Sequence, residues 1–191
     1  MRLYNASSGE ILLNGKNINS YELGSYRKLF SIVTQDSWLY SASIMENIRY
    51  GNFGASDEDV INAAKLAGVD NFINSLPDGY NTIIKEGTSN LSEGQKQLIS
   101  IARAIISNSK VLIMDEATAS VDTVTESSIQ KSLSFILKEK TSIIIAHRLS
   151  TIRNADEILV ISDGKLVERG NHIELINKKG KYFEMYKSSL V

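Results

Sequence analysis

The chain has 191 residues, 42% of them hydrophobic and 23% charged, which is the composition of an ordinary globular domain rather than of a disordered or fibrous protein. Its 21 basic and 22 acidic residues leave a net charge of -1, so there is no general electrostatic attraction to nucleic acid or anionic lipid. Cysteine is absent, which excludes disulfides and thiolate metal sites, and no apolar run reaches the roughly 20 residues of a membrane-spanning helix.

The first thirty residues predict a hairpin and a short helix. Residues 10–13 have the pattern of a strand, and the following Asn14-Gly15 pair favours a tight turn because both residues tolerate positive φ angles. Ser20 is predicted to cap a helix that runs to Leu29.

A buried strand over residues 31–34 is expected next, with Gln35 at its end. From residue 43 to residue 107 the pattern is mostly helical. Ser56 and Asp59 have the spacing of a capping box, and the Leu-Pro-Asp-Gly sequence at 76–79 predicts a break between helices.

Three short runs rich in branched apolar residues predict the strands of a covered sheet: 111–114, 142–146 and 158–161. A helical stretch from Thr125 to Lys138 separates the first two. Alternation of strand, helix and strand is typical of a parallel sheet with crossover helices, so the predicted fold class is α/β with a helical insertion.

Two adjacent carboxylates, Asp115 and Glu116, follow the strand at 111–114. The carboxyl edge of such a sheet is where open α/β folds bind ligands. One carboxylate there can hold Mg2+, and the other can orient or deprotonate a water that attacks a phosphate. The alternative is that the two acids mark an ordinary solvated loop.

A second candidate site opens the predicted helix over residues 96–106. Exposed amides at a helix N-terminus attract anions, Gly94 lets the backbone approach a phosphate, and the Ser92 hydroxyl can donate to it. The alternative interpretation is an N-cap serine beside a surface glycine.

Five motifs, taken in order, resemble those of the ATP-binding cassette (ABC) family. They are the Q-loop Ile32-Val33-Thr34-Gln35, the signature Leu91-Ser92-Glu93-Gly94-Gln95, the Walker B segment Val111 to Glu116, the D-loop Ala119-Ser120-Val121-Asp122 and the switch segment Ile144-Ile145-Ala146-His147-Arg148-Leu149. The resemblance covers essentially the whole chain. It implies a P-loop NTPase-like, mostly parallel sheet core over residues 1–35 and 109–191, with a helical subdomain inserted at 36–108.

The resemblance also implies roles in binding and hydrolysing ATP with Mg2+. Gln35 would contact Mg2+ and the attacking water, Asp115 would support Mg2+, and Glu116 would be the catalytic base. His147 would sense the γ-phosphate; it follows an apolar strand as Glu116 does, so both can emerge at one sheet edge. The remaining nucleotide contacts implied are Ser92, Gly94, Gln95 and Asp122, the first three toward ATP held by a partner.

The sequence departs from the family at one decisive point, since no G-x-x-x-x-G-K segment occurs anywhere in the chain. That loop cradles the phosphates, brings a lysine to them and places a hydroxyl on Mg2+. We expect the chain to begin just past this loop in a longer protein, to be inactive alone and to have marginal stability. Glu93 in place of a signature glycine is a smaller, tolerable departure.

The expected partners are a second nucleotide-binding domain in a head-to-tail dimer and a transmembrane domain, usually on the same natural chain. Residues 40–48 and 146–151 resemble exporters more than importers, which places the parent at the cytoplasmic face of the cell membrane, whereas these 191 residues should be soluble. Drug, lipid and peptide substrates all remain open, as does the choice between homodimer and heterodimer.

One alternative is a naturally shortened, non-hydrolysing module that lends its signature to a complete partner. Another is a DNA-maintenance ATPase, which the short, heptad-free gap from Gln35 to Leu91 disfavours.

Three further residues or segments carry less specific expectations. The sequence at 38–40 is aromatic and apolar, which suits either docking of a membrane-domain helix or core packing. Glu86 matches an acidic position near the membrane-domain interface of exporters, or is a surface glutamate. His172 is expected to be a surface or tail residue.

Overall fold

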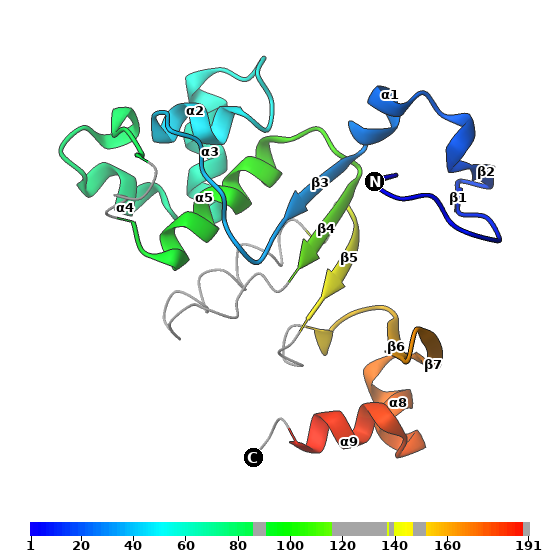
Figure 1. The fold of residues 1–191 in the computed structure, drawn as a ribbon. Coiled ribbons are helices and arrows are strands. Elements are labelled where there is room, and N and C mark those ends of the chain that lie inside the picture. Colours follow the sequence, from blue (N-terminus) through cyan, green and yellow to red (C-terminus); the bar gives the residue numbers. More distant parts are fainter. Residues whose placement is uncertain (86–90, 116–136, 138–139, 147–151, 189–191) are drawn as a thin grey trace. The chain divides into compact units, whose positions relative to one another are not determined.

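The computed structural model describes residues 1–85, 91–115, 137, 140–146 and 152–188 (Figure 1). It divides into two compact units, Met1–Ile143 and Ile144–Val191. Each unit is described below by itself.

The chain opens with the predicted hairpin. Strands β1 (Leu12–Leu13) and β2 (Lys16–Asn17) pair antiparallel, and the turn between them has φ angles of 51° at Asn14 and 75° at Gly15. Two successive positive φ angles are what a type I′ turn requires, so the Asn-Gly prediction is confirmed.

The helix after the hairpin begins later than predicted. Ser20 is the last residue of the 3-10 helix η1 (Ile18–Ser20), and α1 (Leu23–Arg27) is capped by Glu22 instead. The Glu22 carboxylate accepts hydrogen bonds from the amides of Gly24 and Ser25 at 2.7 and 2.6 Å. The prediction of Ser20 as the cap is therefore wrong, because a glutamate two residues on satisfies two amides at once.

The central sheet has the order β3-β4-β5, formed by β3 (Phe30–Val33), β4 (Val111–Asp115) and β5 (Thr141–Ile145). Strands β3 and β4 are parallel, with Phe30 opposite Val111 and Val33 opposite Met114. A parallel pair needs a long crossover connection, and the helical insertion provides it. The predicted α/β class is confirmed.

The strands of this sheet differ in how far their side chains are buried. Val33, Leu112 and Met114 are buried, whereas Ile32, Ile143 and Ile145 are 47 to 53% exposed. The expectation of a covered sheet is thus wrong for β5, in which Ile143 and Ile145 are exposed.

Between β3 and β4 the chain forms the helical insertion. Its elements are α2 (Ile44–Arg49), α3 (Asp57–Ala67), α4 (Asp70–Ser75), the 3-10 helix η2 (Gly79–Asn81) and α5 (Glu93–Ile106). The capping box of Ser56 and Asp59 at the start of α3 is present as predicted. Helix α5 packs against α2, α3 and β3, and Ile48, Val60 and Ile101 are fully buried in this region.

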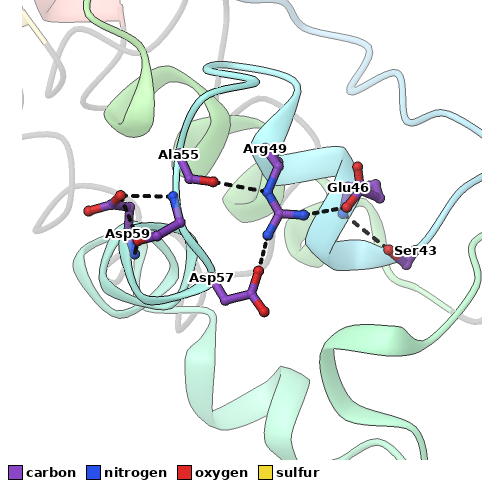
Figure 2. A network of polar contacts seen from close by, with 7 residues as sticks. Ser43, Glu46, Arg49, Ala55, Asp57 and Asp59 are labelled. Atoms are coloured by element: carbon purple, nitrogen blue, oxygen red, sulfur yellow. Dashed lines mark hydrogen bonds and ion pairs between the residues drawn. The ribbon is translucent and has the colours of Figure 1, made fainter.

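A polar network joins the end of α2 to the start of α3 (Figure 2). The Arg49 guanidinium pairs with Glu46 and Asp57 and donates from Nε to the Ala55 carbonyl at 3.2 Å. Because one side chain contacts its own helix, the loop and the next helix, Arg49 fixes how α2 and α3 meet.

The second unit contains β6 (Ile158–Ser162), β7 (Lys165–Gly170), α8 (His172–Lys178) and α9 (Lys181–Ser188). The strand predicted at 158–161 is confirmed, but it pairs antiparallel with β7, which was not predicted. The expectation that it belongs to the covered sheet is wrong, because β6 and β7 form a separate pair in which Leu159 and Ile161 are 54% and 61% exposed. Leu175 and Tyr182 are buried beneath the hairpin. His172 belongs to this packing rather than to an open surface, since its Nδ1 lies 2.8 Å from the Tyr182 hydroxyl. The helix predicted at 125–138 falls, but for residue 137, outside the described residues.

Candidate functional site

Two of the predicted site residues follow neighbouring parallel strands. Asp115 ends β4, one residue beyond Met114, and Gln35 comes two residues after Val33, the β3 partner of Met114. Parallel strands bring their carboxyl ends to one edge, so this register brings both residues to the edge where α/β sheets bind ligands. Gln35 is exposed and Asp115 is partly buried.

The polar groups at this edge are suited to a hard cation. A carboxylate and an amide oxygen are ligands that Mg2+ accepts. No group of three or more histidine, aspartate or glutamate side chains in the described ranges could hold a metal ion by itself.

The N-terminus of α5 carries the second candidate site. Ser92 is the N-cap: its Oγ accepts from the Gln95 amide at 3.2 Å, and Gln95 Oε1 accepts from the Ser92 amide at 2.8 Å. Both side chains thus stabilise the helix. The alternative interpretation is correct for the N-cap serine and wrong for the surface glycine, because Gly94 is buried. The exposed Ser92 hydroxyl keeps its own hydrogen to donate, and Gly94 is buried in the first turn.

The departure at Glu93 has a physical explanation. Glu93 is the first residue of α5, where a negative charge interacts favourably with the helix dipole. Lys96 pairs with it at 2.7 Å. The lysine therefore offsets a carboxylate that would otherwise weaken an anion site at this helix end.

Four other predicted residues lie outside the described residues: Glu86, Glu116, Asp122 and His147. Their roles stay predictions. Nucleotide contact by the described residues also stays a prediction, because their position at a sheet edge or a helix end does not test whether they bind a nucleotide.

An aromatic row lies on the helical insertion, beginning three residues after Gln35. We call it the aromatic surface and define it as Trp38, Tyr40, Tyr50 and Phe53. Successive ring centroids are 4.1, 4.3 and 5.2 Å apart, and Trp38, Tyr50 and Phe53 are 58%, 45% and 75% exposed. The two alternatives for residues 38–40 were an exposed docking surface and core packing. Trp38 is exposed, so it does not belong to the core, while Leu39 and Tyr40 are partly buried.

Sequence reasoning missed three polar residues that hold the segment after Gln35. Gln97 accepts a hydrogen bond from the Ser37 hydroxyl, and Asn47 and Arg103 bind the backbone beyond it. Gln97 gave a signal that could have been used, because it is a polar residue four before Ile101 on the buried side of α5. Arg103 gave none.

Comparison with known proteins agrees with this geometry. The sequence profile described as ABC transporter matches residues 1–119, more than half of the chain. The chain belongs to the ABC transporter family. The resemblance inferred from the motifs, and the α/β fold that it implied, are therefore confirmed.

Individual relatives cover nearly the whole chain. An uncharacterized ABC transporter ATP-binding protein of Bacillus subtilis is 48% identical over 98% of it, and a fatty acid ABC transporter ATP-binding/permease protein of Mycobacterium bovis is 49% identical over 97%. The structure of a bacterial Atm1-family ABC exporter with ATP bound aligns over 100% of the chain, with a TM-score of 0.94 and 41% identity. The chain spans only 31%, 29% and 34% of these three proteins, respectively.

No helix in the described part of this ABC transporter chain is long and apolar enough to cross a membrane.

Proposed function

We propose that this chain is the greater part of the ATP-binding and hydrolysing domain that powers an ABC exporter. The observation that supports the proposal is that one chain carries two features from which the two halves of a nucleotide site could be built. One is the sheet edge with Gln35 and Asp115, and the other is the α5 N-terminus with Ser92. The proposed arrangement is a core of residues 1–35 and 109–191 with the helical subdomain 36–108 between them.

In this proposal each residue has a distinct task. Asp115 and Gln35 hold the metal at the sheet edge, and Glu116 takes the proton of the attacking water, while His147 and Asp122 contact the phosphate region. Bound Mg2+ would supply neutralisation of phosphate charge. Ser92, Gly94 and Gln95 would meet ATP held by a second domain, because they lie at a helix end that offers amide donors to an anion.

The proposed partners are a second such domain, packed head to tail, and a membrane domain that contacts the aromatic surface. Exposed aromatic rings in a continuous row are typical of protein interfaces. The names of relatives that join ATP-binding and permease parts support a membrane domain in the same natural protein, at the cytoplasmic face of the membrane.

These 191 residues alone should not hydrolyse ATP, because they contain no G-x-x-x-x-G-K segment. The same observation favours a second candidate, a non-hydrolysing module that lends its signature to a complete partner. The two candidates differ in what the natural gene encodes before Met1.

The test begins with the coding frame upstream of Met1. A Gly-Lys-Ser or Gly-Lys-Thr loop preceded by about six membrane spans supports the exporter; a stop codon supports the non-hydrolysing module. The full gene product is then assayed for Mg2+-dependent ATP hydrolysis. Glu116→Gln should lower kcat by at least about 100-fold, while the exposed Glu10→Gln should not change it. Unchanged hydrolysis in the Glu116 variant would refute the assigned base.

A further inference from the structure

The feature that carries a further inference is the side chain of Arg103, near the C-terminal end of α5. Its Nη1 donates to the Trp38 carbonyl at 3.1 Å, and its Nε and Nη2 donate to the carbonyl and the side-chain oxygen of Asn47 at 2.9 and 3.1 Å. The guanidinium carbon also lies 5.6 and 5.7 Å from the ring centroids of Tyr40 and Tyr50. One cation therefore contacts three of the four members of the aromatic surface.

Asn47 also binds the backbone of the segment that carries Trp38 and Tyr40. It is fully buried, accepts from the Tyr40 amide at 2.8 Å, and donates to the carbonyls of Tyr40 and Ser43 at 3.0 Å each. Since Arg103 binds two atoms of Asn47, the arginine fixes both the rings and the chain that bears them. The backbone of Gly51 passes close to α5 as well, because a Cβ there would overlap the Arg103 carbonyl.

Burying the Arg103 guanidinium costs desolvation free energy. Burial lowers the pKa of Arg103, while the facing Tyr40 and Tyr50 act in the opposite direction. No carboxylate among the described residues pairs with the guanidinium. An apolar side chain would pack there without the cost of removing a charge from water, so the hydrogen-bonding fork of arginine is the property that this position uses.

Helix α5 connects Arg103 to the signature residues. Ser92 caps the helix and Arg103 lies eleven residues later, which corresponds to about three turns and about 16 Å along the axis. Midway, Gln97 receives the Ser37 hydroxyl hydrogen bond, so the segment after Gln35 is tied to α5 at two points. Because Ser92 and Arg103 belong to one continuous helix, a displacement of α5 as a body would move both.

We propose that Arg103 is a positioning residue that fastens the aromatic surface to α5, so that displacement of the surface is transmitted to the signature residues at the other end of the helix. The transmission rests on the proposed function. The fastening of the surface does not.

The first experiment tests the fastening in the 191-residue chain. Trp38 is its only tryptophan, so collisional quenching of fluorescence reports on the aromatic surface alone. Arg103→Lys keeps the charge but loses the planar fork, and should raise the acrylamide quenching constant of Trp38 about twofold as the segment gains motion. Arg49→Lys is the matched control, because it weakens the network of Figure 2 without contacting the aromatic surface. Equal quenching in both variants, at equal fractions folded, would overturn the proposal.

The second experiment tests the transmission in the full natural gene product. Arg103→Lys should lower kcat for ATP hydrolysis about three- to tenfold with KM for ATP kept within about twofold, while Arg49→Lys leaves both unchanged. Unchanged kcat beside increased quenching would mean that Arg103 orders the surface without transmitting anything. Absence of ATP hydrolysis in the unmodified product would sink the proposed function instead, and the quenching result would still stand.

Discussion

Glu22 illustrates how one side chain can set the pH dependence of local stability. Hydrogen bonds from Ser25, and then from Gly24, lower the pKa of this carboxyl from its ordinary value of 4.5 to about 2. A group whose pKa is lower in the folded state stabilises the fold above its unfolded pKa. This contribution is therefore complete above about pH 4.5 and is lost as the pH falls toward about 2.

We accordingly expect Glu22→Gln to lower Tm by about 2 °C at pH 7, because only one acceptor oxygen remains for two amides. The difference from the unmodified chain should shrink between pH 4.5 and pH 2. Thermal melts across this range provide the measurement. Glu10→Gln is the control, because it removes an exposed carboxylate charge but keeps an oxygen that can accept the hydrogen bond from Asn17 Nδ2. A Tm difference that stays constant with pH would contradict the assigned role.

Gly51 shows a different residue-scale constraint, which is close approach of two backbones. A Cβ at this position would overlap the Arg103 carbonyl and lie 2.8 Å from the Ile106 side chain. Gly51→Ala should therefore destabilise the chain by about 1–3 kcal/mol, as overpacking does. At Gly54 the nearest atom would be 3.6 Å away, so Gly54→Ala serves as the matched control. Urea midpoints that fall equally in the two variants would show that α5 can shift away from residue 51 at little cost in free energy.

At the scale of elements, the sequence predicted those features whose signals are local. The Asn14-Gly15 turn and the Ser56 and Asp59 capping box each depend on a few adjacent residues, and both are present. The order of strands and helices predicted a parallel sheet, and β3 and β4 form a parallel pair in it. That pairing is sufficient to bring the ends of the two strands, and with them Gln35 and Asp115, to one edge of the sheet.

Other elements depend on contacts between distant residues, which no local pattern encodes. The exposure of Ile143 and Ile145 depends on what packs over β5. A continuous run of branched residues does not indicate which of its side chains will be buried. Strand β7 alternates poorly because three successive residues at its start are exposed. Arg103 could not be identified because its partners lie 56 and 65 residues away in the chain.

The N-terminus of α5 allows helix capping and nucleotide contact to be separated. Serine and aspartate are equally good N-caps, whereas alanine costs about 1 kcal/mol. We expect Ser92→Asp to keep the Tm of the chain, and Ser92→Ala to lower it. In the full gene product, Ser92→Asp should nevertheless lower ATP hydrolysis by at least about tenfold, because a carboxylate repels a phosphate at close range. An aspartate variant with normal hydrolysis would mean that Ser92 is only a cap.

At the scale of the whole molecule, exposed apolar strands are the dominant feature. Ile143 and Ile145 are exposed in the central sheet, and Leu159 and Ile161 are 54% and 61% exposed on the hairpin of the second unit. Exposed apolar side chains on strands favour self-association. Because the two units have separate cores, their unfolding need not be a single two-state transition.

The chain alone should therefore melt at or below the usual mesophilic range of about 45–65 °C and associate as its concentration rises. Ile143→Thr and Ile161→Thr each keep a branched side chain that suits a strand while removing apolar surface. Together they should reduce association, seen by light scattering, without lowering Tm, because neither side chain is buried. Lower solubility in this double variant would show that the two isoleucines are covered in solution. A monomeric chain with a cooperative transition above about 65 °C would contradict marginal stability itself, since exposed strands of this extent would then carry no measurable cost.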